Sequence, residues 1–345
     1  MSATELVPVE TPAGEAGMPT VSVVIPTRNR AAWLAYTLHA VALQVYPSEL
    51  VEVIVVDNSS TDNTEEVVRA WADRYPFPLH FHRKANEGPA ASRNYAAARA
   101  TGEVIAFTDS DCMPEPDWLA NGVRALERGV GLVTGLIIPR RTEDTHFFFN
   151  AQLGAVLRDD GLYRTASLIV PRAVFDAIGG FDETYALGRG GALLGGEDTD
   201  LGWRIRGRHL RAVFSPDVRV VHLATPISLR GWMRRAQLAQ IMPRLVRAFP
   251  QLRETVLWHR YFHMDDDFFF IAGAAGVVIA LFTGWWPFAV LPLGFLWANY
   301  RNIGGMVRKG RLDKAAAMLV LLVARTGVRV GVLSYASVKY RCVVL

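Results

Sequence analysis

Short apolar runs alternate with segments of helical spacing between residues 21 and 108. The apolar runs end in turns or polar clusters, as buried strands do, and the segments between them repeat apolar positions every three or four residues. Strands that alternate with helices predict a mostly parallel sheet with helices on both faces. The expected strands are 21–26, 51–57, 79–82 and 103–108, and the expected helices are 30–44, 63–74 and 88–100.

The alternation is less regular after residue 130. A glycine-rich stretch at 188–196 predicts a mobile loop there. The further strands that we expect are 130–138, 166–170 and 218–223, and the further helices are 172–178 and 197–206.

The last third of the chain has a different pattern. Arginines surround apolar positions in residues 226–264, which is typical of a basic amphipathic juxtamembrane segment. Residues 268–286 carry no charge over 19 positions, close to the length that spans a bilayer, and a shorter uncharged run follows at 287–300. We therefore expect a membrane hairpin over 268–300, either spanning or re-entrant; a buried hairpin of a soluble protein is the alternative.

The segment after this hairpin is basic and then apolar. Residues 301–314 carry five basic side chains, which favours the cytoplasmic side of a membrane. Residues 315–338 are apolar but contain Arg325 and Arg329 on one helix face, so we expect a helix lying in the membrane interface. The expected parts are a disordered tail (1–18), a catalytic domain (19–225), the juxtamembrane segment (226–264) and the hairpin with its interfacial helix (265–345).

Composition and charge narrow the class of protein. Of 345 residues, 51% are hydrophobic and 20% are charged, which excludes a disordered chain, and the two cysteines exclude a disulfide framework. Residues 301–345 hold nine basic side chains and one acidic, whereas the preceding 300 have a small acidic excess. This distribution argues against a nucleic-acid partner and favours anionic lipid. The first 18 residues lack the basic start and apolar core of a signal peptide, which predicts a cytoplasmic catalytic domain.

Asp109-Ser110-Asp111 is the strongest chemical signal. It follows the strand expected at 103–108, and alternate residues of an extended chain point to the same side, so both carboxylates can face one point. Magnesium in proteins typically takes one or two carboxylates together with substrate phosphates. The motif therefore indicates a metal–diphosphate site, although such triplets also occur by chance in surface turns.

Other polar residues follow the first two strands. Asp57 ends the strand 51–57, at the edge of the sheet where ligands bind, and can accept hydrogen bonds from a ribose or a base. Pro26, Thr27 and Arg28 end the strand 21–26 and can line the same pocket. Arg93, one turn into a helix, can reach a phosphate or a base, or is an ordinary surface arginine.

Two further positions carry possible chemistry. Glu197 and Asp198 follow the glycine-rich stretch and begin a helix, which suits a general base assembled by loop closure but also suits helix capping. His222 ends the last strand, where it is either a metal ligand or a core histidine with satisfied hydrogen bonds.

The order of these motifs resembles glycosyltransferase family 2, whose members are inverting enzymes with the GT-A fold. The resemblance covers about residues 20–225 and rests on six motifs in sequence. They are Pro26-Thr27-Arg28-Asn29, Val55-Val56-Asp57-Asn58-Ser59-Ser60-Thr61-Asp62, Asn86-Glu87-Gly88 with Arg93-Asn94, Asp109-Ser110-Asp111, Ile178-Gly179-Gly180-Phe181-Asp182-Glu183 and Gly196-Glu197-Asp198-Thr199-Asp200-Leu201.

The resemblance implies roles for the matching residues. Asp57 would bind the base or ribose, with Thr27 and Arg93 in the same pocket. Asp109 would contact the ribose or sugar side and share the metal with Asp111, which would ligate Mn²⁺ or Mg²⁺ bridging the diphosphate. His222 would be a further metal ligand, as in some members of the family. Asp198, with Glu197 beside it, would deprotonate the acceptor hydroxyl.

We therefore expect an enzyme that moves one sugar from a nucleotide-sugar, with uridine diphosphate favoured, to a lipid-linked or membrane-proximal acceptor. The Gln-x-x-Arg-Trp signature of processive synthases is not evident, which favours single addition. The expected location is the cytoplasmic face of the cell membrane, with attachment through residues 265–345. A polyprenyl-phosphate glycosyltransferase and a non-catalytic nucleotide-binding adaptor are the alternatives.

Overall fold

The computed structural model describes residues 17–141, 155–185, 195–224, 227–284, 290 and 292–345. The chain divides into two compact units, Met1–Ile227 and Ser228–Leu345, which are described here separately. Residues 1–16 of the expected tail and most of the expected glycine-rich loop fall outside the described residues.

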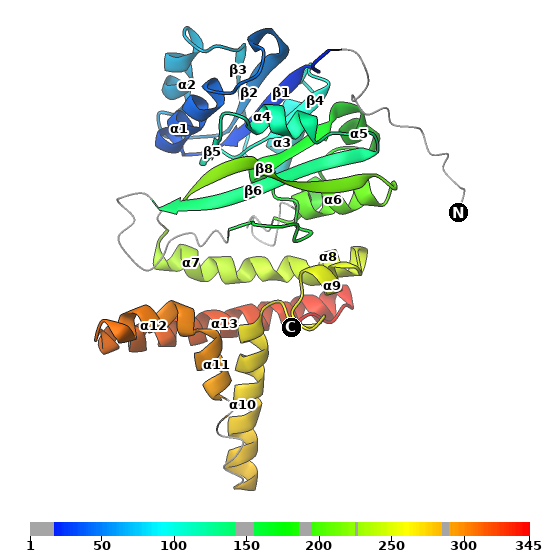
Figure 1. Cartoon of the computed structure of the whole chain (residues 1–345). Coiled ribbons are helices and arrows are strands. Elements are labelled where there is room, and N and C mark those ends of the chain that lie inside the picture. The colour runs from blue at the N-terminus through cyan, green and yellow to red at the C-terminus, as the bar shows by residue number, and fades with distance from the viewer. Residues whose placement is uncertain (1–16, 142–154, 186–194, 225–226, 285–289, 291) are drawn as a thin grey trace. The chain divides into compact units, whose positions relative to one another are not determined.

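The first unit is built on one mixed sheet of eight strands (Figure 1), in the order β3-β2-β1-β4-β7-β6-β8-β5. The four strands expected before residue 110 form its parallel half. In the other half β7 runs antiparallel to β4 and β6, β6 and β8 are parallel, and β5 is antiparallel to β8. The strands are β1 (Val21–Thr27), β2 (Val51–Asn58), β3 (Leu79–Lys84), β4 (Val104–Phe107), β5 (Cys112–Pro114), β6 (Val130–Arg141), β7 (Leu168–Pro171) and β8 (Arg211–Ala224).

Two strands differ from the sequence-based expectation. The last strand was expected at 218–223 but begins at Arg211, since β8 pairs along the whole length of β6 through two register shifts. The three-residue strand β5 was not expected, because it is too short to show a periodic pattern.

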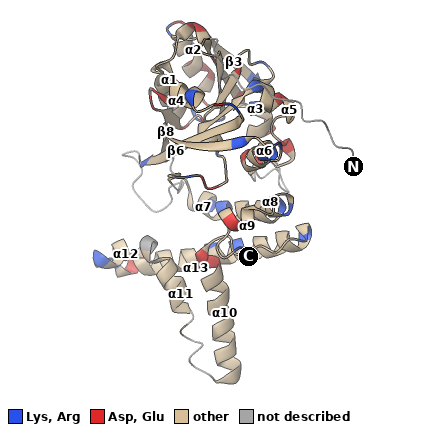
Figure 2. Ribbon diagram, turned by 45° about the vertical axis from the view of Figure 1, so that its right-hand side comes forward, with Lys and Arg blue, Asp and Glu red and all other residues tan. Residues whose placement is uncertain are grey.

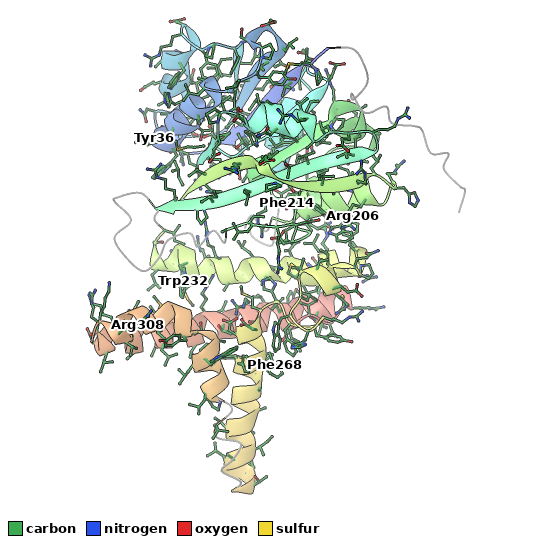
Figure 3. The ribbon with its side chains drawn as sticks, in the orientation of Figure 1. Tyr36, Arg206, Phe214, Trp232, Phe268 and Arg308 are labelled. Atoms are coloured by element: carbon green, nitrogen blue, oxygen red, sulfur yellow. The ribbon has the colours of Figure 1, made fainter. Side chains whose placement is uncertain are left out.

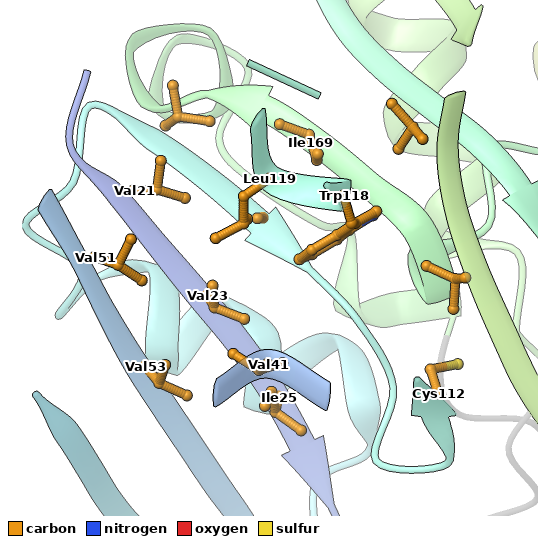
Figure 4. Packing of buried hydrophobic residues seen from close by; sticks show 14 of the residues in the cluster. Val21, Val23, Ile25, Val41, Val51, Val53, Cys112, Trp118, Leu119 and Ile169 are labelled. Carbon is orange, nitrogen blue, oxygen red and sulfur yellow. The ribbon is translucent and has the colours of Figure 1, made fainter. Parts of the chain in front are cut away.

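Helices cover both faces of the sheet, as expected. On one face, Val23 and Ile25 of β1 pack with Trp118 and Leu119, which are fully buried (Figure 4). On the other face, Phe107 contacts Phe175 with 5.5 Å between ring centroids. The helices of this unit are α1 (Ala31–Ala42), α2 (Thr64–Ala72), α3 (Pro89–Ala97), α4 (Trp118–Arg124), α5 (Arg172–Ala177) and α6 (Glu197–Arg206), with 3₁₀ turns at Ser48–Leu50, Thr165–Ser167 and Glu183–Tyr185.

The second unit is helical. The segment expected to be one amphipathic stretch forms several short helices, because turns interrupt it after residues 248 and 255. The expected basic loop is helical up to Arg308. The helices are α7 (Leu229–Arg235), a 3₁₀ helix (Ala236–Ile241), α8 (Met242–Ala248), α9 (Leu252–Thr255), α10 (Asp265–Thr283), α11 (Pro292–Ala298), α12 (Tyr300–Arg308) and α13 (Leu312–Tyr340).

Two of these helices, α10 and α13, are long and apolar enough to cross a membrane. Figure 2 shows no charged residue along α10 beyond its first turn. Length and composition alone do not distinguish the two helices, but their contacts within this unit differ.

Two glycines of β6 provide a test of the β6–β8 packing. A Cβ at Gly135 would lie 1.7 Å from the backbone oxygen of Val218, whereas a Cβ at Gly131 would meet only side-chain atoms of Ile205 and Leu210. Side chains can move and a paired strand cannot, so we expect Gly135→Ala to lower the free energy of unfolding by about 3 kcal/mol and Gly131→Ala by about 1 kcal/mol. Chemical denaturation of the full chain measures both; equal effects would contradict this account of the register shift.

Candidate active site

The carboxyl ends of β1 and β2 present two buried polar atoms without hydrogen-bond partners. Thr27 and Asp57 are register neighbours in the parallel pair. Asp57 is fully buried; its Oδ1 accepts a hydrogen bond from the backbone N–H of Ser60 at 2.9 Å, and its Oδ2 has no hydrogen-bond partner. The hydroxyl of Thr27 also has no partner. Buried polar groups are rarely left unpaired, so this pair of atoms indicates a place for a polar ligand.

The remaining residues expected at this edge are less enclosed. Pro26 is half-buried within β1, and Arg28 is exposed just after the strand, with its guanidinium beside the side-chain amide of Asn86. Nε of Arg83, on β3, forms an ion pair with Oδ2 of Asp57 at 3.6 Å, beyond hydrogen-bond distance. Arg83 was not singled out from the sequence, since nothing marks it within its strand.

Arg93 connects two carboxylates that are distant in sequence. It lies on α3 and is 5% exposed. Its Nη2 donates to Oδ1 of Asp109 at 2.6 Å, and its Nη1 donates to Oε1 of Glu197 at 3.1 Å. Arg93 is therefore neither an ordinary surface arginine nor a free one: it joins the end of β4 to the start of α6. Its Nε and the other oxygen of Glu197 lack hydrogen-bond partners.

The Asp109-Ser110-Asp111 motif lies next to His222 in the structure. β5 pairs with β8 so that Cys112 stands opposite His222, and the N–H of Leu223 donates to the backbone oxygen of Asp111 at 2.8 Å. Four side chains come together here: Asp109, Asp111, Cys112 and His222. Each offers one potential ligand atom, and these four atoms all lie within 4.8 Å of one another.

The donor chemistry of this group fits a divalent cation. Carboxylates suit Mg²⁺ and Mn²⁺, and imidazole is a common metal ligand. The negative charge of Asp111 is balanced by an ion pair with Arg30. Its Oδ1 lies 3.7 Å from Nε2 of His222. Burial raises the pKa of Asp111, although His222 and Arg30 oppose the rise. Arg30 is a second residue that the sequence did not reveal, because only the folded chain brings the two side chains together.

Asp198 lies at the start of α6, after Gly196 in the left-handed conformation. Its Oδ1 accepts the backbone N–H of Thr199 at 2.7 Å within the first turn of α6, while the N-cap position is held by Gly196 without a side-chain cap. Burial and the neighbouring carboxylate of Glu197 raise the pKa of Asp198 to about 7. A carboxyl with a pKa near neutrality is suited to take up a proton during a reaction.

The structure thus places the expected site residues along one edge of the sheet. Asp57 and Thr27 form one group, Asp109, Asp111 and His222 form a second, and Glu197 with Asp198 form a third that Arg93 connects to the second.

Comparison with known proteins identifies this arrangement. A family model described as glycosyl transferase family 2 matches residues 22–189. Glycosyltransferase AglE of Haloferax volcanii is 31% identical over 216 residues, which cover 61% of this chain and 68% of the archaeal protein. Validoxylamine A glucosyltransferase of Streptomyces hygroscopicus subsp. jinggangensis is 28% identical over 289 residues, covering 72% of this chain and 65% of that protein.

A solved structure supports the fold. Mannosyltransferase PcManGT from Pyrobaculum calidifontis, in complex with GDP-Man and Mn²⁺, superimposes with a TM-score of 0.61 at 22% identity, over 91% of this chain and 87% of that one. The mixed sheet with its flanking helices is accordingly the GT-A fold. The chain belongs to glycosyl transferase family 2 and is a glycosyltransferase.

Proposed function

We propose that this chain is a metal-dependent, inverting enzyme that transfers one sugar from a nucleotide-sugar to a hydroxyl of a lipid-linked or membrane-proximal acceptor. The observation that carries the proposal is the cluster of Asp109, Asp111 and His222, connected through Arg93 to the carboxyl pair at the start of α6. Such a cluster can hold a diphosphate through a cation at one end and remove a proton at the other.

The donor would occupy the edge formed by β1, β2 and β4. Oδ2 of Asp57 and the hydroxyl of Thr27, which have no hydrogen-bond partner, can accept hydrogen bonds from a base or ribose, and the hydroxyl can also donate one. Asp109, Asp111 and His222 would hold Mn²⁺ or Mg²⁺, and this ion would supply neutralisation of the charge that develops on the leaving diphosphate. PcManGT holds GDP-Man with Mn²⁺, whereas the family resemblance favours a uridine nucleotide, so both donors belong in any test.

Asp198 would act on the acceptor. Its carboxylate takes the proton of the acceptor hydroxyl while the oxygen attacks the anomeric carbon, and the nucleoside diphosphate leaves from the opposite side. One displacement inverts the anomeric centre, so an α-linked donor yields a β-linked product.

Attachment to a membrane would keep the site close to a lipid-linked acceptor. The proposal of attachment rests on the length and apolar character of α10 and on the basic residues that follow it. With the catalytic unit and these basic residues facing the cytoplasm, the enzyme would work on the cytoplasmic face of the cell membrane.

The donor site can be tested by ligand-induced stabilisation. UDP- and GDP-sugars should raise the melting temperature of the full chain by several degrees in the presence of Mn²⁺ and by much less after chelation, because binding to the folded state alone stabilises it. Asp111→Asn should abolish the Mn²⁺-dependent part. If no donor stabilises the wild type in either condition, the assigned donor pocket is wrong.

The catalytic base can be tested by substitution. Asp198→Asn should lower kcat for sugar transfer or donor hydrolysis by about 10²-fold or more, since the amide cannot take the proton. Asp176→Asn, on the exposed side of α5, serves as the matched control and should leave the rate unchanged. Near-full activity of Asp198→Asn would contradict a hydroxyl acceptor and favour a polyprenyl phosphate.

The pH dependence tests the pairing of Glu197 with Asp198. The base works as its carboxylate, so kcat/KM should fall as the pH drops through about 7. Glu197 raises the pKa of Asp198 by repulsion, so Glu197→Gln should move this acid limb to lower pH. A limb that stays in place, in a variant that melts like the wild type, would show that Glu197 does not act on the base.

A further inference from the structure

The two long apolar helices of the second unit, α10 and α13, differ in their contacts with the rest of that unit. Arg329 lies in α13, 17 positions after the helix begins, and is 5% exposed. Its Nε donates to Oδ1 of Asp267 at 2.6 Å, and its Nη2 donates to Asp266; Thr326 donates to the other oxygen of Asp266 at 3.2 Å. Both acids lie in the first turn of α10. The middle of α13 is therefore fixed at the beginning of α10.

The end of the chain returns to the same place. The backbone N–H of His263 donates to the oxygen of Leu345 at 2.6 Å, and the N–H of Leu345 donates to the oxygen of Tyr261 at 2.8 Å. Arg253 donates to the oxygen of Val343 at 3.0 Å. The segment after α13 thus lies beside the segment before α10.

The middle of α13 also contacts α7. The guanidinium of Arg325 lies 4.5 Å from the ring centroid of Trp232, on α7, and buried residues recur every three or four positions from Ala315 to Ala336. One face of α13 therefore packs against protein along most of its length. In Figures 1 and 2 α13 runs across the beginning of α10, not alongside it.

The chain that leaves the far end of α10 also comes back. A Cβ at Gly294 of α11 would lie 2.3 Å from the ring of Phe269, and one at Gly273 would lie 3.2 Å from Pro292. The rings of Phe270 and Phe295 are 5.9 Å apart. α11 therefore packs on the first half of α10, and α12 continues from there to Arg308, at the end of that helix in Figure 3.

On the far half of α10, Gly276 and Ala280 are buried, but no described residue covers the large apolar side chains. Val278, Leu281 and Phe282 are 51%, 75% and 87% exposed. The uncharged part of α10, residues 268–283, is about 24 Å long, and with these exposed side chains it suits the hydrocarbon interior of a bilayer. Charged side chains are costly within hydrocarbon, which favours a position of the charged first turn of α10 and of the Arg329 cluster at the membrane boundary.

We propose that the chain inserts from one side of the membrane only: α10 and α11 enter and return as a hairpin, and α13, although long enough to cross, lies in the interface. The beginning of α10, the end of α12 and Leu345 would then all lie on the side of the membrane on which the catalytic unit lies. This inference depends on the membrane attachment proposed above and adds its topology.

Cysteine labelling of the full chain tests the topology. The background is Cys342→Ser, since Cys112 is fully buried. Single cysteines at four exposed positions, Asp73→Cys, Lys309→Cys, Lys339→Cys and Phe282→Cys, are placed in sealed vesicles of phosphatidylcholine and phosphatidylglycerol and treated with a membrane-impermeant maleimide from either side. Asp73, exposed in the catalytic unit, reports the reference side.

We expect the first three cysteines to react from one side and Phe282→Cys to react only after detergent is added. Labelling of Lys309→Cys from the opposite side to Asp73→Cys would show that α10 crosses and overturn the hairpin. Labelling of Lys309→Cys and Lys339→Cys from different sides would show that α13 crosses. Free labelling of Phe282→Cys in intact vesicles would overturn membrane insertion itself, without affecting the proposed chemistry.

Discussion

The bridge from Arg93 to Asp109 and Glu197 holds the candidate active site together. A buried guanidinium is stable only when its donors meet carboxylates, and one buried carboxylate without a counter-charge would be costly. Here a single cation on α3 satisfies one carboxylate at the end of β4 and another at the start of α6. The donor side and the acceptor side of the proposed reaction are thereby kept at a fixed separation. Desolvation and the neighbouring carboxylate of Glu197 raise the pKa of Asp198, so it holds its proton more tightly than a surface acid does.

The antiparallel edge of the sheet supplies the other half of the site. β5 is only three residues long, yet its pairing with β8 sets Cys112 opposite His222 and so brings an imidazole to the second carboxylate of the Asp109-Ser110-Asp111 motif. Arg30, from the turn after β1, balances Asp111 in this structure. The side chain of Arg30 is partly exposed, whereas that of Asp111 is buried.

The second unit also contains a buried arginine that pairs with two carboxylates. Arg329 pairs with two carboxylates in the first turn of α10 and so fixes α13 across the beginning of that helix. In both units a buried arginine joins helices that are far apart in sequence. In the first unit the arginine connects the carboxylates of the candidate site, and in the second it connects α13 to the first turn of α10.

The sequence by itself determined the parallel half of the sheet, the motif positions and the apolar C-terminal region, because strand and helix periods and a carboxylate pair after a strand are local features. It could not determine β5, the early start of β8, or the helical state of residues 301–308, since pairing across the sheet and packing between helices decide these. Asp57, Asp109, Asp111 and Asp198 could be singled out from neighbouring residues alone. The parts played by Arg93, Arg30 and Arg329 could not, because an arginine acquires its role from the carboxylates that folding places beside it, and these lie 16 to 104 positions away. Only the tertiary structure could make that choice.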